Sequence, residues 1–219
     1  MRVLIILIIL SCNSHLFGQC NTQPKVENPI LYPVRLIPLL ADKKETTLEL
    51  FNREKRTNEK IVSVYEIETW KPNDSIAKTL IADIISYEDS SKPINKIMLY
   101  YPINKYGYGE FLLDTFNNNL SAFKVIGIFT ANFDNDDDNE IGLIYSYNSE
   151  FLNGAIEYRT VYYKKNKYLG VYWEFQLPVF YRITDDRFNC SKSPQKYSCS
   201  FDTVNNVINY LNENAIDRK

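Results

Sequence analysis

The sequence predicts a mainly β protein: an antiparallel sheet, a sandwich or a partial-propeller-like domain, with an amphipathic helix at the C-terminus. Short segments rich in β-branched and aromatic residues alternate with polar residues between turn signals, which is typical of strands. Tyrosine occurs 17 times, and its wide ring with a polar tip suits a pleated surface. Only seven glycines and no Ser/Gly-rich linker indicate a single domain, over residues 35–219.

The first 18 residues are expected to be a signal peptide. Met1-Arg2 precede an apolar run from Val3 to Leu10, which is too short to span a bilayer as a helix but suits the apolar core of a secretory signal. Cleavage near Gly18 is favoured. The alternative is a lipobox-like site at Ile9-Leu10-Ser11-Cys12, where Cys12 becomes a lipidated first residue. Both predict a secreted, periplasmic or cell-surface protein without a transmembrane span in its mature chain.

The next residues are expected to lead into the domain. Residues 19–34 are polar and contain three prolines, which suits an extended lead-in. Residues 36–40 fit a short strand, and Pro38 favours an edge position. Residues 46–51 alternate leucine with polar neighbours, as a half-buried strand does. The charged run at 53–60 indicates an exposed turn.

The central part of the chain predicts a series of strands. Pro102 is expected to end one of them, and Lys164–Lys167 to be the turn of a hairpin. Residues 75–87 stay ambiguous, because their apolar positions fit a helix or a strand. The segments with strand character are 61–70, 96–101, 111–116, 122–130, 141–147, 155–163, 168–175 and 179–183.

The C-terminal residues predict an amphipathic helix that packs on a sheet, with Asp202 as its N-cap. Its apolar residues recur at helical spacing, at Val204, Val207, Ile208, Leu211 and Ala215. Just before it, Cys190 and Cys199 flank a polar loop, and in an oxidising compartment they are expected to form a disulfide.

Histidine use excludes several kinds of active site. His15 is the only histidine, and it lies in the leader or next to the lipid anchor. The folded domain therefore has no histidine for a Ser-His-Asp or Cys-His system or for a histidine-ligated zinc or iron site. No phosphate-binding glycine motif and no nucleophile elbow occurs. The net charge of −2 and the scattered basic residues give no sign of nucleic-acid binding.

An acidic loop lies between two strand-like segments. Its oxygen-bearing side chains are spaced 1, 3, 5, 7 and 9, at Asn132, Asp134, Asp136, Asp138 and Glu140. Converging oxygen ligands suit a hard cation, and the close carboxylates would repel one another without a counter-ion. We expect a structural calcium loop; the alternative is a solvated acidic turn. An EF-hand is excluded, because no glutamate stands at position 12 and the flanks are strand-like.

Residues 132–141 (Asn-Phe-Asp-Asn-Asp-Asp-Asp-Asn-Glu-Ile) resemble the calcium loop of FG-GAP/VCBS-type repeats, and the likeness extends over about residues 122–170. The resemblance implies calcium ligation by Asn132, Asp134, Asp136 and Glu140, and by the backbone carbonyl of Asp138. Asp137 stands where the repeats have glycine, and one copy is visible where a propeller needs four or more. Leader and loop together resemble those of exported proteins of Bacteroidota-type bacteria.

The expected function is that of a non-enzymatic binding or surface-associated module, whose tyrosines contact an unidentified protein or glycan. One alternative is a periplasmic inhibitor or immunity-type protein. Another is a carboxylate-dependent, glycan-active envelope factor, for which paired acids are needed. The acids on or beside strands among aromatic residues, each expected to face solvent, are Glu110, Asp114, Glu157 and Glu174.

Overall fold

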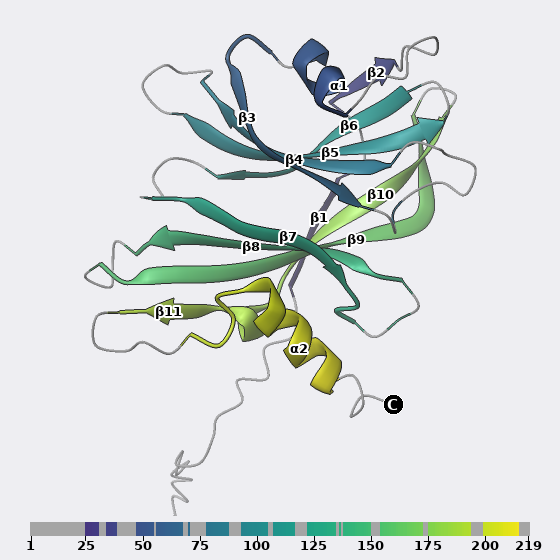
Figure 1. Ribbon diagram of the computed structural model, residues 1–219. Coiled ribbons are helices and arrows are strands. Elements are labelled where there is room, and N and C mark those ends of the chain that lie inside the picture. Colours follow the sequence, from purple (N-terminus) through teal and green to yellow (C-terminus); the bar gives the residue numbers. More distant parts are fainter. Residues whose placement is uncertain are drawn as a thin grey trace, which may run out of the picture.

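Eleven strands and two α-helices make up the part of the chain that the computed structural model describes (Figure 1). The described residues are 25–30, 34–38, 47–54, 56–67, 70, 78–87, 93–104, 107–116, 122–134, 136, 138–149, 154–172, 175–193 and 199–214. The expected signal peptide, Cys12 and the turn at 71–74 lie outside them. None of the described helices is both long and apolar enough to cross a membrane.

The strands form two antiparallel sheets, which we call sheet A and sheet B. Sheet A has the order β1-β10-β9-β8-β7, with β11 paired to β9, and sheet B has the order β2-β6-β5-β4-β3. The strands of sheet A are β1 (Lys25–Ile30), β7 (Lys124–Ala131), β8 (Glu140–Asn148), β9 (Ile156–Tyr172), β10 (Phe175–Thr184) and β11 (Cys190–Lys192). Those of sheet B are β2 (Arg35–Pro38), β3 (Glu59–Ile67), β4 (Thr79–Ser86), β5 (Ile94–Asn104) and β6 (Gly107–Phe116).

Each sheet is built around a meander of four strands that follow one another in the chain. β3 to β6 form the meander of sheet B, and β7 to β10 form that of sheet A. The strands before them pair with the last strand of each meander, β1 with β10 and β2 with β6. Part of the expected lead-in therefore belongs to sheet A. The two sheets face each other (Figure 1), so the fold is the sandwich among the predicted architectures.

The main core lies between the two sheets. Ile81, Leu99 and Phe111 from sheet B meet Leu143 and Phe180 from sheet A, and all five are buried. These residues come from strand positions whose side chains alternate between the two faces of their sheet. Side chains along these strands therefore alternate between the two faces of each sheet, as predicted. In much of the molecule both of these faces are buried.

The outer faces of both sheets are also covered. Helix α1 (Thr47–Glu54) buries Leu50 and Phe51 against sheet B, and helix α2 (Val204–Asn214) buries Val207 and Leu211 against sheet A. The four layers are visible in Figure 1. β4 is nearly all buried, because both faces of sheet B are covered at this strand. A strand that is buried on both faces shows no apolar–polar alternation in its sequence. This explains the ambiguity of the segment 75–87, whose residues Thr79–Ser86 form strand β4.

Three local predictions were wrong. The segment 46–51 lies largely in α1, where Leu50 and Phe51 contact the same apolar cluster from one helix face. β5 continues through Pro102, which lies at a register shift where a missing N–H is tolerated. β9 runs without a turn through Lys164–Lys167, and a β-bulge opposite Pro178/Val179 takes up the extra residues.

The C-terminal predictions agree more closely with the structure. Cys190 and Cys199 form the disulfide. The helix α2 is present, but its N-cap is one residue later than predicted: the Thr203 hydroxyl accepts a hydrogen bond from the backbone N–H of Asn206. Asp202 accepts one from the Asn206 side chain, at 3.0 Å between Nδ2 and Oδ1, and pairs with Lys192.

Candidate metal centre

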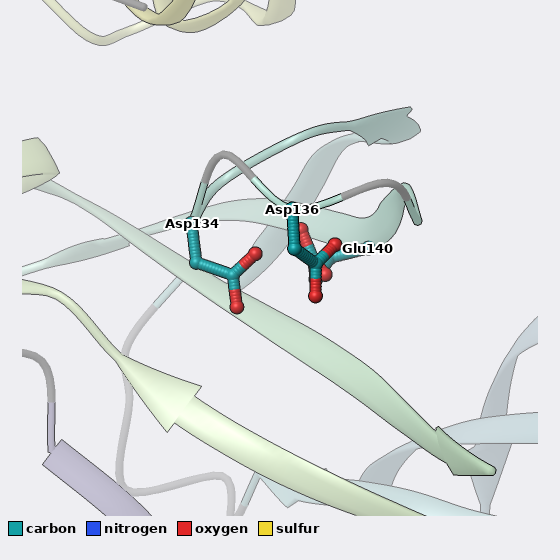
Figure 2. Close-up of side chains that lie close together, drawn as sticks. All are labelled: Asp134, Asp136 and Glu140. Atoms are coloured by element: carbon teal, nitrogen blue, oxygen red, sulfur yellow. The ribbon is translucent and has the colours of Figure 1, made fainter. Parts of the chain in front are cut away.

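Three carboxylates converge in the loop between β7 and β8. Each of Asp134, Asp136 and Glu140 contributes one carboxylate oxygen, and these three oxygens lie within 4.8 Å of one another. Figure 2 shows the three side chains pointing into the same space, the two aspartates from the loop and Glu140 from the first position of β8. The sequence spacing of 1, 3, 5, 7 and 9 therefore brings three of the five predicted ligands together through side-chain carboxylates.

Glu140 forms the buried base of this cluster. Its residue is only 1% exposed, and its Oε2 accepts a hydrogen bond of 2.8 Å from the backbone N–H of Phe133. Burial is the largest influence on its pKa and raises it to about 7; the negative charges of Asp134 and Asp136 act in the same direction. The Phe133 N–H and the Lys164 ammonium lower the pKa and only partly offset these effects. This carboxylate therefore needs a nearby positive charge to stay ionised.

The remaining predicted ligands lie in the same loop. Asn132 donates through Nδ2 to the backbone carbonyl of Asp136, and its Oδ1 is buried without a hydrogen-bond partner among the described residues. The backbone N–H of Asp138 donates to Asp136 Oδ1 at 2.8 Å, which holds that carboxylate in position. Ligation by the Asp138 carbonyl stays a prediction.

Two aromatic residues attach the loop to the folded domain. Phe133 is 1% exposed and stacks on Tyr162, with ring centroids 4.4 Å apart and planes 10° from parallel. Trp70 packs on Phe180 in the inter-sheet core and donates its indole N–H to the carbonyl of Asn139 at 2.7 Å. One end of the acidic loop is therefore fixed to sheet A and the other to the inter-sheet core. The sequence pattern alone indicates neither anchor.

A lysine from a neighbouring strand supplies the positive charge. Lys164 of β9 places its ammonium 2.6 Å from Asp136 Oδ2, in close contact with Asp134 Oδ2 and 4.0 Å from Glu140 Oε1. These carboxylates raise the pKa of Lys164 above its ordinary value, although its partial burial acts against this. We expected Lys164 to lie in an exposed turn. The available signal was strand alternation, which puts Lys164 on the same face as Tyr162 beneath the loop.

The residues at this site fit a calcium ion. Calcium takes six to eight oxygen ligands at about 2.3–2.6 Å, so two oxygens on one ion lie no more than about 5 Å apart. The three carboxylates meet this requirement. Asn132, in the same loop, has a buried Oδ1 without a hydrogen-bond partner among the described residues, and its ligation stays a prediction. An all-oxygen set without histidine or cysteine suits a hard cation rather than a transition metal.

A second polar cluster lies where β6, β1 and β10 meet. A β-bulge at Leu113 turns Asp114 toward sheet A, where its Oδ2 accepts hydrogen bonds from Arg182 (2.6 Å) and from the Tyr163 hydroxyl (3.1 Å). Arg182 also pairs with Glu27. Burial raises the pKa of Asp114, and the Arg182 charge opposes this rise. Asp114, Arg182 and Glu27 line a cleft of about 630 Å³, whose other lining residues are Lys25, Ile30, Leu112, Leu113 and Thr115.

The described acids that were considered for a glycan site are each paired with an arginine and hydrogen-bonded to a tyrosine. Glu110 is buried on sheet B, where it pairs with Arg35 at 2.5 Å and accepts a hydrogen bond from the Tyr100 hydroxyl. Glu157 pairs with Arg159 and accepts a hydrogen bond from Tyr147. The expectation that each acid faces solvent was therefore wrong for Glu110 and for Asp114, whose side chain is only 12% exposed. Glu174 lies outside the described residues.

The comparisons with known proteins add no relative. No family model, no curated protein and no solved structure matches this chain. The resemblance to FG-GAP/VCBS loops therefore rests on residues 132–141 and their surroundings alone, and it stays a prediction.

Proposed function

We propose that this protein is an exported, calcium-stabilised β-sandwich that acts as a non-enzymatic binding or surface-associated module. One observation carries the calcium part: Asp134, Asp136 and Glu140 each place one carboxylate oxygen within 4.8 Å of the other two. Asn132 of the same loop has a buried Oδ1 without a hydrogen-bond partner among the described residues. A buried acceptor without a donor is costly, and a cation that this loop binds with Asn132 Oδ1 among its ligands would satisfy it.

The proposed role of calcium is structural. Its ligands come from the loop and from the first residue of β8, so the ion ties the end of β7 to the start of β8. Both strands belong to the sheet whose inner face forms the main core. A ligand that binds only the folded state, at a concentration 100 times its Kd, stabilises that state by about 2.7 kcal/mol. We therefore expect calcium to raise the thermal stability of the whole domain.

Thermal unfolding of the mature protein, with excess calcium and with a chelator, tests this proposal. Calcium should raise Tm by several degrees and should be retained after desalting, at about one ion per chain by elemental analysis. The variant D134N/D136N should lose both effects, because amides are weaker calcium ligands than carboxylates. E213Q is the matched control: Glu213 is an exposed carboxylate on α2, far along the chain from the loop. It should respond to calcium as the wild type does.

Two results would contradict the proposal. A wild-type protein that shows no Tm shift and retains no calcium would exclude the structural metal. A calcium response that D134N/D136N retains in full would place the ion elsewhere. The expected export has its own readout, since the mass of the mature chain should correspond to cleavage near Gly18, or to a lipid on Cys12.

Binding is favoured over hydrolysis because the acids near the sheet interior are already engaged. Asp114 accepts hydrogen bonds from Arg182 and Tyr163, and Glu157 is paired with Arg159. Inverting and retaining glycosidases need one protonated acid and one free carboxylate across the scissile bond. Release of reducing ends from envelope polysaccharides, lost in D114N, would instead favour the glycan-active alternative. The periplasmic inhibitor stays a further alternative, which a co-purifying target protein would support.

The partner is expected to be a protein or a glycan that stacks on tyrosine. Tyr147 of β8 is the half-buried candidate for this contact. Its neighbour on the same face, Tyr145, lies 6.2 Å away between ring centroids but packs on Phe116 in the main core. Arg159 donates to the Tyr147 hydroxyl from the neighbouring strand β9. Aromatic rings beside fixed polar groups are typical of both kinds of interface.

A further inference from the structure

We propose that Lys164 is a built-in competitor of calcium: its ammonium occupies the carboxylate cluster when calcium is absent, and calcium binding displaces it. This inference rests on the proposed calcium site and adds how the site is regulated. It makes the loop a site for one cation at a time, either the tethered ammonium or the free ion.

The position of the ammonium is the first argument. Lys164 Nζ is 2.6 Å from Asp136 Oδ2 and contacts Asp134 Oδ2, two oxygens that a calcium ion between these carboxylates would also use. Its distance to the buried Glu140 Oε1 is 4.0 Å, so it faces all three acids. A divalent ion and an ammonium cannot share this space, because like charges only a few ångströms apart repel strongly.

The origin of the lysine is the second argument. Lys164 lies on β9, where its backbone pairs with Tyr181 of β10, so the root of the side chain stays fixed in the sheet. The buried neighbour Tyr163 points to the other face of the strand. Four flexible methylene groups separate the ammonium from this rigid root, and the side chain is 32% exposed. The ammonium can therefore leave the cluster by side-chain rotation alone, without movement of the strand.

The charges of the cluster explain what each state gains. Three carboxylates and one ammonium sum to −2, whereas three carboxylates and one calcium ion sum to −1. Calcium neutralises more of the negative charge than the ammonium does. In the calcium-free loop the lysine still neutralises part of the charge and reduces the repulsion between the three carboxylates. The consequence is a lower apparent calcium affinity, since the metal binds only the fraction of molecules whose lysine has left. The domain then stays folded where calcium is scarce and is stabilised further where calcium is abundant.

The variant K164M tests this inference, because methionine keeps the apolar length of the side chain without its charge. Calorimetric titration with calcium should give a Kd at least tenfold lower than that of the wild type. The calcium-free variant should also unfold at a lower temperature, so that its Tm shift with calcium is larger. K124M is the matched control: Lys124 is an exposed residue at the far end of β7, and this variant should bind calcium as the wild type does.

A second measurement needs no variant and applies even if K164M fails to fold. Amine acylation of the wild-type protein, followed residue by residue by mass spectrometry, reports whether each lysine is engaged. Lys164 should react slowly in chelator and several times faster with calcium, whereas Lys124 should react at the same rate in both.

The outcomes separate the two proposals. Calcium that binds the wild type and K164M with equal affinity, or that leaves the acylation of Lys164 unchanged, would overturn the competition while leaving the calcium site intact. Calcium binding that disappears in K164M would show that the lysine supports the metal instead of opposing it. If neither protein binds calcium, the proposed function itself fails, and the competition with it.

Discussion

Single buried polar residues define the chemistry of this protein more than its apolar core does. Glu140, Asp114 and Asp83 are carboxylates on strands; Glu140 and Asp83 are buried, and Asp114, which was expected to face solvent, is largely buried. Glu140 has a backbone donor and a nearby ammonium, and Asp114 has an arginine. Asp83 differs, because its Oδ1 is buried without a hydrogen-bond partner among the described residues.

Asp83 makes stability depend on pH in a defined direction. Burial raises its pKa from 3.8 to about 6, so the folded protein keeps this proton at pH values where the unfolded chain has lost it. Stability from this group is complete below about pH 4 and is lost as the pH rises to about 6. One pKa unit corresponds to about 1.4 kcal/mol, so the loss approaches roughly 3 kcal/mol.

The variant D83N isolates this effect from other titrating groups. Relative to the wild type, D83N should gain about 3 kcal/mol of unfolding free energy between pH 4 and pH 7, because asparagine carries no proton to lose. Urea denaturation of both proteins at pH 4, 5, 6 and 7 measures the difference directly. A difference that stays constant across this range would show that Asp83 titrates in the folded protein as it does in the unfolded chain.

At the scale of elements, periodicity identified most strands and the C-terminal helix, and it failed where a second layer changed the pattern. Residues 46–51 alternate apolar and polar side chains, but the adjacent Leu50 and Phe51 both reach the outer cluster of sheet B, which only a helix allows. The basic run around Lys164 looked like a turn, because the carboxylates that compensate its charge lie some 30 residues away. A short stretch of sequence shows neither the sheet on which a helix packs nor the distant carboxylates with which a lysine pairs.

The acidic loop was the most predictable part of the site. The spacing alone predicts five ligand positions, and three of these residues, Asp134, Asp136 and Glu140, do converge. Phe133 was visible as the apolar position in the pattern, but its stacking on Tyr162 depends on the register of β9 with β8. Strand register is set by tertiary contacts, so the anchors and the lysine could not be derived from the loop itself.

Helix α2 is seated on β7 through a close approach at Gly127. A Cβ added there would lie 2.5 Å from Val204 Cγ2, at the first residue of the helix. The variant G127A should therefore push the helix start away from sheet A and cost about 1–3 kcal/mol, as overpacking usually does. Chemical denaturation monitored by tryptophan fluorescence and far-UV circular dichroism measures this cost.

The second variant V204A supplies the control for this contact. It removes Cγ2, so G127A/V204A should be more stable than the sum of the two single losses predicts. Strictly additive losses would show that the glycine is needed for the backbone of β7 and not for the helix.

At the scale of the whole molecule, two consecutive meanders must be held face to face, and polar residues contribute to that contact. Asp114 of sheet B reaches Arg182 and the Tyr163 hydroxyl of sheet A. Trp70 on the sheet B side reaches the acidic loop through its indole N–H. The sequence predicts each strand but not which strands face one another, so these links between the sheets appear only in three dimensions.

The Asp114–Arg182 pair is the sharpest test of how the sheets are joined. The two side chains are only 12% and 16% exposed, so removing one charge leaves the other largely out of water. R182M should therefore lose about 3–5 kcal/mol of unfolding free energy, measured by urea denaturation at a fixed calcium concentration. The double variant D114L/R182M should recover most of this loss, because a buried ion pair replaced by apolar side chains of similar size is often neutral.

The stability losses of D114L and R182M could instead add up in the double variant. This result would show that the two residues act independently, Asp114 through its hydrogen bond from Tyr163 and Arg182 through its ion pair with Glu27. Recovery would instead show that apolar contact supplies most of the stability at this place and that the ion pair adds little to it.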